Sequence, residues 1–238
     1  MKTEEKRFLY SIIFPFIFLL IIWIVELFEQ ALGTSYSFLG VYPRTIEGLA
    51  GIVTMPFIHG GVDHILSNTF PVFILSTGII YLYRDLGYKA ILYIWLTTGI
   101  ITWAIARPSY HIGASGLIYG FAAFLFFSGL LRRDNRMLAI SMIVAFLYGS
   151  LVWGLLPVKP GVSFEGHLAG ALSGLIFAYV YRNKGPQPLK YEWELEEEYD
   201  EQSTRSIPID FRFQTQSTND EIKITYIYRD GDDEDPIS

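Results

Sequence analysis

Residues 8–28 read FLYSIIFPFIFLLIIWIVELF, an almost uninterrupted run of apolar side chains. About 20 such residues span the hydrocarbon core of a bilayer. The run is too long for the core of a signal peptide, and Glu26, Glu29 and Gln30 stand where a small-residue cleavage site would follow, so we expect a retained helix. Of the 238 residues, 51% are hydrophobic, and the mean hydropathy is +0.33, which soluble domains rarely reach. The sequence therefore predicts a membrane-embedded protein.

Six apolar segments, each bounded by charged residues, glycine or proline, are candidate transmembrane helices. The last five contain more glycine, serine, threonine and alanine than the first, and small residues let membrane helices approach closely. We therefore expect an all-α membrane protein that folds as a bundle of six transmembrane helices. The six segments cover about 8–29, 64–83, 88–106, 114–131, 137–155 and 165–182.

The basic residues divide unequally between the two sides of the membrane that six spans define. Lys and Arg are enriched in cytoplasmic loops. The poorer side has Arg44, Arg107 and Lys159. The bias predicts a multi-pass protein of the plasma (inner) membrane with both termini in the cytoplasm. The richer side has Lys2, Lys6, Arg7, Arg84, Lys89, Arg132, Arg133, Arg136, Arg182 and Lys184.

The charge balance divides the chain into two regions. Residues 1–184 carry 13 Lys and Arg against 9 Asp and Glu, which suits contact with anionic lipid. Residues 185–238 carry 5 against 15. We expect the first region to be the membrane domain and the second to be an acidic cytoplasmic tail. The tail is expected to be mostly disordered, with a strand-like alternation at 222–228 that would allow a short hairpin.

Four polar side chains lie at the starts of predicted spans, where burial in lipid is costly and suggests a function. His64 and Asn68 open the second span four residues apart, on one helix face. Ser115 begins the fourth span, and His167 lies near the start of the sixth. In the predicted topology all four lie at the outer ends of their helices. They would therefore share one depth and converge on a cavity open to the outside.

Each of these residues also has an ordinary structural explanation. A serine in a membrane helix usually bonds a backbone carbonyl of its own helix. Asparagine usually holds membrane helices together, and histidine often does. Their occurrence at one depth is what favours a catalytic site.

The sequence around Ser115 suits a nucleophile. Gly113 and Gly116 leave room for a substrate backbone and permit a tight entry into the helix. The unpaired N–H groups of a helix N-terminus can hold the oxyanion of a tetrahedral intermediate. Tyr119 follows one turn later on the same face, where it could pack on an imidazole.

The sequence after His167 suits close helix packing. Gly170 and Gly174 form a ridge of small residues that would let the sixth span press against the fourth. A neutral His167 placed beside Ser115 could then take the hydroxyl proton and return it to the leaving amine. The nearby carboxylates lie at the water boundary, so we expect a Ser–His dyad and not a triad.

Together these motifs resemble the rhomboid family of intramembrane serine proteases. The resemblance covers about residues 8–183 and leaves out the tail. Each motif alone is weak, but the three occur in order and in the right spans. They are HILSN at 64–68, GASG at 113–116 with Tyr119, and GHLAG at 166–170 with Gly174.

The resemblance implies a role for each of these residues. Ser115 would be the nucleophile and His167 its general base, with Tyr119 stacked on His167. His64, Asn68 and the backbone N–H of Ser115 would form the oxyanion hole. The supporting glycines would be Gly113, Gly116, Gly170 and Gly174.

The resemblance also implies an activity. The protein would be a serine endopeptidase that cleaves transmembrane segments of membrane-protein substrates near small, helix-breaking residues. The fifth span, about 137–155, and the loop through Pro157 and Pro160 would gate substrate entry. We expect transmembrane substrates and the lipid bilayer as partners, with no cofactor, metal or nucleic acid.

Other functions fit the sequence less well. A catalytically inactive rhomboid-like protein that binds membrane clients would typically lack the serine or the histidine. A small transporter would need polar groups deeper along several helices, or inverted repeats, and the sequence has neither. A metal hydrolase is disfavoured because we interpret His59 and His111 as outer-loop residues, which leaves His64 and His167 without a third ligand. The chain has no cysteine, which excludes disulfides and thiol nucleophiles.

Overall fold

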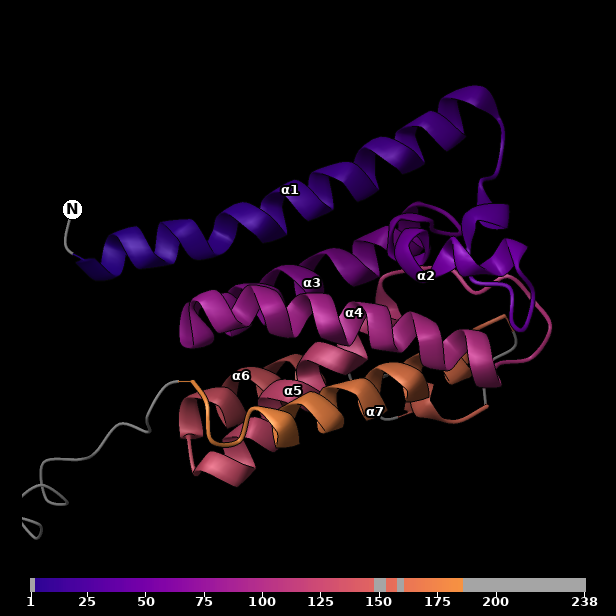
Figure 1. The fold of residues 1–238 in the computed structure, drawn as a ribbon. Helices are drawn as coiled ribbons and strands as arrows, with labels where there is room; N and C mark the ends of the chain where they lie inside the picture. Colours follow the sequence, from indigo (N-terminus) through magenta and orange to yellow (C-terminus); the bar gives the residue numbers. More distant parts are fainter. Residues whose placement is uncertain (1–2, 148–152, 158–160, 186–238) are drawn as a thin grey trace, which may run out of the picture. The chain divides into compact units, whose positions relative to one another are not determined.

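A computed structural model describes residues 3–147, 153–157 and 161–185, and in this part of the chain the regular secondary structure is helical (Figure 1). This confirms the predicted class, an all-α helical membrane bundle. One short α-helix and four 3₁₀ turns complete the described structure: α2 (Gly51–Thr54), η1 (Ser37–Leu39), η2 (Glu47–Leu49), η3 (Met55–Phe57) and η4 (Trp153–Leu155). The longer helices are α1 (Thr3–Leu32), α3 (Val62–Tyr83), α4 (Asp85–Ile105), α5 (Ser115–Arg132), α6 (Asn135–Leu147) and α7 (Phe164–Val180).

Each of the six predicted spans coincides with one long helix. Among the described residues, α1, α3, α4 and α5 are long and apolar enough to cross a membrane, whereas α6 and α7 are apolar but shorter. The span count of six therefore stays a prediction. The fifth predicted span runs past α6 into residues 148–152, and the predicted tail follows Gly185; both lie outside the described residues.

The helices differ in how much surface they bury. Within the most apolar window of each helix, 61% of residues are buried in α3 and 56% in α5, against 22% in α1. α1 packs along α3 and leaves most of its apolar side chains exposed, as a lipid-facing helix does (Figure 1). The core therefore lies among α3, α4, α5 and α7, and α1 covers one side of it.

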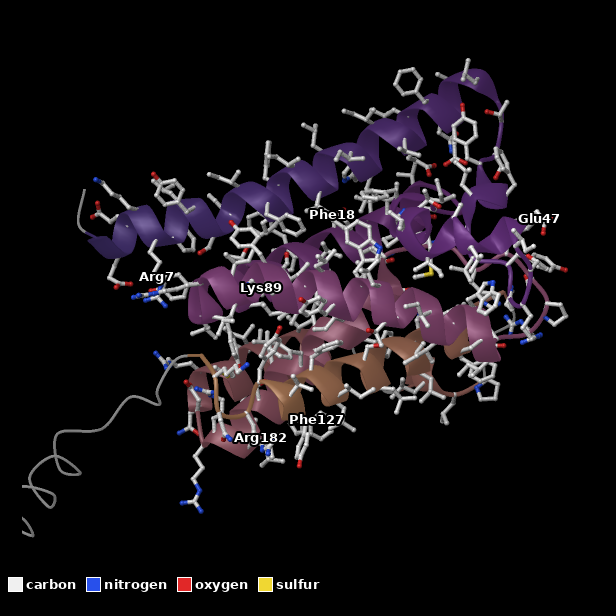
Figure 2. The ribbon with its side chains drawn as sticks, in the orientation of Figure 1. Arg7, Phe18, Glu47, Lys89, Phe127 and Arg182 are labelled. Atoms are coloured by element: carbon white, nitrogen blue, oxygen red, sulfur yellow. The ribbon has the colours of Figure 1, made fainter. Side chains whose placement is uncertain are left out.

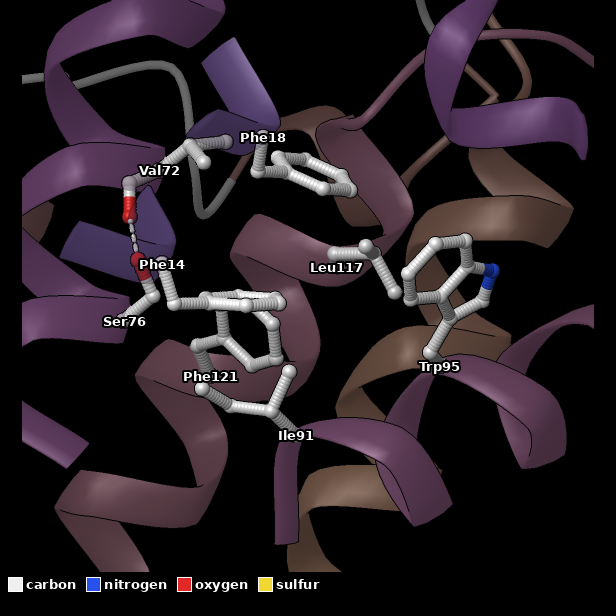
Figure 3. Close-up of a pocket in the computed structure, with 8 residues that line it drawn as sticks. All are labelled: Phe14, Phe18, Val72, Ser76, Ile91, Trp95, Leu117 and Phe121. Carbon is white, nitrogen blue, oxygen red and sulfur yellow. Dashed lines mark hydrogen bonds between the residues drawn. The ribbon is translucent and has the colours of Figure 1, made fainter. Parts of the chain in front are cut away.

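Aromatic side chains hold α1 against this core. The ring centroid of Phe18 lies 5.1 Å from that of Phe57 and 5.5 Å from that of Trp95. A small pocket beside Phe18 is lined by apolar side chains of α1, α3, α4 and α5 (Figure 3). Its one hydroxyl, on Ser76, is bonded to the carbonyl of Val72. This pocket contains neither Ser115 nor His167, so we interpret it as interhelical packing.

The pairing of α5 with α7 is the tightest in the bundle. A Cβ added at Gly170 would overlap the carbonyl oxygen of Gly116, and one at Gly174 would overlap that of Gly120. The two backbones are therefore in direct contact, which only glycine permits. Lipid tails are as apolar as the helices, so the hydrophobic effect does not drive helices together in a bilayer. Dispersion contacts at such short range are then a main source of attraction.

The connection between α1 and α3 folds back over the helix ends. The backbones of Val41 and His111 exchange two hydrogen bonds, of 2.9 and 2.8 Å. The Arg44 guanidinium donates to the carbonyl of Ala106 at 2.8 Å. Ile46, in the same loop, is nevertheless 82% exposed. Figure 2 shows Arg7 and Arg182 at one end of the helices and Glu47, in this loop, at the other.

Cysteine labelling tests the predicted orientation, because the natural chain has no cysteine. We expect a membrane-impermeant maleimide to label Ile46→Cys in intact cells. We expect Lys6→Cys and Arg182→Cys to react only after permeabilisation, since six spans put both ends on one side and the excess of Lys and Arg predicts that this side is the cytoplasm. The unsubstituted chain is the blank. Labelling of Lys6→Cys or Arg182→Cys in intact cells would contradict the topology.

The glycine contact predicts which Gly→Ala substitutions the bundle tolerates. Gly174→Ala forces a methyl group into the backbone of α5 and is expected to cost about 1–3 kcal/mol. Gly78→Ala is the matched control, because its Cβ would meet side-chain methyl groups and no backbone: those of Ile140 at 3.3 and 3.5 Å and one of Leu125 at 3.8 Å. Thermal unfolding in detergent should show a lower midpoint for Gly174→Ala and an unchanged or higher one for Gly78→Ala. Equal midpoints would show that the contact is not stabilising.

Candidate active site

A glycine turn places Ser115 at the first residue of α5. Gly113 has a φ of +104°, which favours glycine, and its N–H donates to the carbonyl of Met55 at 2.9 Å. A Cβ at Gly113 would lie 2.9 Å from Cε1 of His64 and 3.8 Å from Oγ of Ser115. The turn therefore brings the His64 ring close to the Ser115 hydroxyl.

Ser115 and His167 are hydrogen-bonded, with 2.8 Å between Oγ and Nε2. The other ring nitrogen of His167, Nδ1, lies 2.8 Å from the carbonyl oxygen of Gly154. A carbonyl can only accept, so Nδ1 carries the proton and donates it to Gly154. Nε2 then presents its lone pair to the Ser115 hydroxyl, which donates. The network thus assigns the tautomer that a general base requires.

Tyr119 packs on one face of the His167 imidazole. Its ring is stacked on that of His167, with centroids 4.2 Å apart and an interplanar angle of 15°. Gly154 closes the third side, since a Cβ there would overlap the Tyr119 hydroxyl. Gly154 lies in η4 and belongs to no motif that we recognised in the sequence. His167 is thereby fixed by a ring, a carbonyl and a hydroxyl.

His64 and Asn68 lie one turn apart on α3 and supply hydrogen-bond donors. Nδ1 of His64 accepts from the Gly60 N–H at 3.4 Å, which leaves Nε2 as the donor. A Cβ at Gly113 would lie 3.1 Å from this Nε2. Asn68 is 6% exposed, and its Nδ2 has no hydrogen-bond partner among the described residues. Such an amide is free to bind an oxygen of a ligand.

Two further histidines were interpreted from the sequence as outer-loop residues. Both do lie in loops, but His59 is 3% exposed and His111 is 2% exposed. Nε2 of His59 accepts from the backbone N–H of Ala114 at 3.3 Å, directly before Ser115. The His111 ring bonds Ser163, which caps α7. The sequence did contain a signal for the second contact, because His111 precedes Ser115, and Ser163 precedes His167, by four residues each.

No three side chains of metal-binding type gather at one point within residues 3–147, 153–157 and 161–185. The described groups around Ser115 are imidazoles, an amide, a hydroxyl and backbone atoms. They are suited to proton transfer and to binding an anionic oxygen.

The burial of His59 predicts an acid-sensitive fold. Burial, reinforced by the neighbouring His64, lowers the pKa of His59 from 6.5 to about 3. Below pH 6.5 the unfolded chain therefore binds a proton that the folded state excludes down to about pH 3. Stability is full above pH 6.5 and falls on acidification, by up to about 1.4 kcal/mol per pH unit for this group.

Thermal unfolding between pH 7 and pH 4 tests this linkage. We expect His59→Gln to unfold at a lower temperature than wild type at pH 7 but to lose less stability on acidification. A residual slope should remain, because burial also lowers the pKa of His111. Identical slopes for the two proteins would show that His59 is not the titrating group.

Comparison with known proteins places the chain in a family. The sequence model described as the Rhomboid domain matches residues 47–184. An uncharacterized protein of Mycobacterium tuberculosis is 36% identical over 174 residues, which cover 68% of this chain and 72% of the relative. A Bacillus subtilis protein named as a candidate rhomboid protease is 26% identical over 139 residues, 54% of this chain and 65% of the relative. With its apolar helices, this chain is a multi-pass membrane protein that belongs to the rhomboid family.

Proposed function

We propose that this protein is an intramembrane serine endopeptidase that cleaves transmembrane segments of other membrane proteins. The observation that carries the proposal is the 2.8 Å hydrogen bond between Ser115 Oγ and His167 Nε2. The base is presented in the correct tautomer because Nδ1 is bound by Gly154. A nucleophile, a base and a group that orients the base are the minimum for acyl transfer.

The first step would be attack of Ser115 Oγ on the scissile carbonyl carbon while Nε2 of His167 takes the hydroxyl proton. The imidazolium that forms is stabilised by the Gly154 carbonyl and by the Tyr119 ring face. His167 then gives the proton to the leaving amine, and the C–N bond breaks. Water, deprotonated by the same Nε2, hydrolyses the acyl-enzyme and restores the Ser115 hydroxyl.

The developing oxyanion would be held by three donors: Nε2–H of His64, Nδ2–H of Asn68 and the N–H of Ser115 at the start of α5. Donors that are fixed before the reaction and point at the developing charge contribute most to such catalysis. The unpartnered Asn68 amide supports this assignment, since a buried donor normally has an acceptor.

Substrate would enter from the lipid beside α6, which the family resemblance assigns as the gate. α6 packs on α5, and its Phe146 is exposed where the described part of the helix ends. A transmembrane segment that unwinds near small residues would offer an accessible peptide bond to Ser115.

A catalytically inactive protein that binds membrane clients is the alternative proposal. It is disfavoured because Ser115 and His167 are both present and hydrogen-bonded. A client-binding protein has no need of the tautomer that Gly154 imposes, and the relatives named as rhomboid proteins do not by themselves decide between the two.

Activity-based labelling separates these two functions. We expect a fluorophosphonate to label wild type and not Ser115→Ala, because only a serine activated by His167 attacks the phosphorus. His167→Ala should also remain unlabelled. In cleavage of a transmembrane reporter, both variants should fall by about 10⁴-fold or more. Asn68→Ala should fall by about 10²-fold, since the other donors remain.

Ser173→Ala is the matched control. Ser173 lies on α7 below His167, and its hydroxyl bonds only the Ala169 carbonyl of its own helix. We expect wild-type labelling and cleavage from this variant. Cleavage retained in Ser115→Ala would refute the nucleophile, and a folded wild type that neither labels nor cleaves would favour the client-binding protein.

A further inference from the structure

A second serine–histidine hydrogen bond joins the same two chain segments one turn ahead of the first. His111 Nδ1 lies 2.6 Å from Ser163 Oγ. Four residues later on each segment, Ser115 meets His167. The residue types are exchanged, so each segment gives one serine and one histidine. The segment that leads into α5 and the segment that leads into α7 are therefore paired in parallel, with the same four-residue step between the two bonds on each.

The direction of this second bond follows from its neighbours. Nε2 of His111 lies 2.9 Å from the carbonyl oxygen of Arg107, so Nε2 carries the proton and donates it. Nδ1 must then accept, and the Ser163 hydroxyl donates to it. The Ser163 oxygen in turn accepts the N–H of Gly166 at 3.1 Å and caps α7. A single chain of donors therefore runs from the first turn of α7 to the loop before α5.

Both ends of this chain are anchored. The His111 backbone is paired with Val41, which fixes it to the loop after α1. On the other side, the Ser163 carbonyl accepts the N–H of His167 at 3.2 Å. Arg107 contacts Glu165 in the first turn of α7 at 3.3 Å. A movement of Ser163 would therefore be passed directly to His167.

We propose that His111 and Ser163 are a positioning pair that holds His167 within proton-transfer distance of Ser115. The glycine contact sets how closely α5 and α7 approach along their lengths, and the His111–Ser163 bond sets the register of their ends. The pair does not touch the reacting atoms. This inference rests on the proposed protease function, which it deepens by naming residues outside the dyad on which the rate depends.

Ser163 is not a second nucleophile. Its hydroxyl donates to His111 as that of Ser115 donates to His167, but the Ser163 oxygen also accepts the Gly166 N–H, which engages a lone pair that an attack would need. Attack on a substrate would break the cap of α7, which is worth about 1 kcal/mol. The fluorophosphonate should therefore modify Ser115 alone.

Kinetics of four variants test the pair. His111→Phe keeps an aromatic ring and the Ser163 cap but removes the bond, and Ser163→Ala removes both bond and cap. We expect each to lower kcat by about 10- to 100-fold, since small misplacements of reacting groups cost that much, and to change KM by less than about 3-fold. Ser163→Thr keeps the hydroxyl and should restore most of the rate. The double variant should be no slower than the slower single one.

A spectroscopic measurement makes the test independent of cleavage. The chain has four histidines, so ¹⁵N-histidine NMR with single substitutions assigns each imidazole. We expect the His167 Nε2 resonance of His111→Phe to move toward its value in Ser115→Ala, because the Ser115 bond is weakened. Ser173→Ala, on the same helix, should leave this resonance unchanged.

The outcomes separate this inference from the proposed function. If wild type cleaves while His111→Phe keeps both its kcat and its His167 resonance, the positioning pair is wrong and the protease stands. If wild type neither cleaves nor labels, the protease is wrong, and the His167 resonance alone decides the pair. If only Ser163→Ala is slow, the cap matters and the bond to His111 does not.

Discussion

Direct backbone contact between α5 and α7 is the constraint on which the candidate site depends. Helices in lipid gain little from burying apolar surface against each other, so close approach and dispersion must hold them together. Gly170 and Gly174 provide that approach by meeting the carbonyls of Gly116 and Gly120. Gly116 directly follows Ser115 in the chain, so the contact that stabilises the helix pair also limits how far Ser115 can lie from His167.

Orientation of His167 by a carbonyl suits the intramembrane site that we propose. A carboxylate would favour the imidazolium more strongly, but an ionised group in the bilayer interior carries a penalty of several kcal/mol unless it is paired. The Gly154 carbonyl gives the same tautomer without a net charge. In the proposed dyad the His167 imidazole is therefore less basic than it would be beside a carboxylate, but the site stays neutral between reactions. Stacking on Tyr119 stabilises the imidazolium charge only when it forms.

The helices could be predicted from the sequence, whereas the loops could not. Apolar runs located α3 and α4 within a few residues, because span length is a property of local composition. The motifs around Ser115 and His167 identified the family. Gly154 was missed because a carbonyl has no sequence signature. The sequence predicts His59 and His111 as outer-loop residues but not their burial, because loop burial depends on tertiary contacts, such as the Val41–His111 bridge, that follow no period.

Unequal hydrogen bonding distinguishes the supporting residue His111 from the proposed oxyanion donor Asn68. Both ring nitrogens of His111 have polar partners that account for its burial. Asn68 Nδ2 has none within the described structure, and an unpaired buried donor costs about 1–3 kcal/mol. Satisfied groups stabilise a fold, while an unsatisfied one lowers its stability unless a ligand completes it. Asn68 lies one turn from His64 on α3. The hydrogen bond that its Nδ2 lacks in the free protein could therefore form to the oxyanion of the transition state, which would be stabilised relative to the resting state.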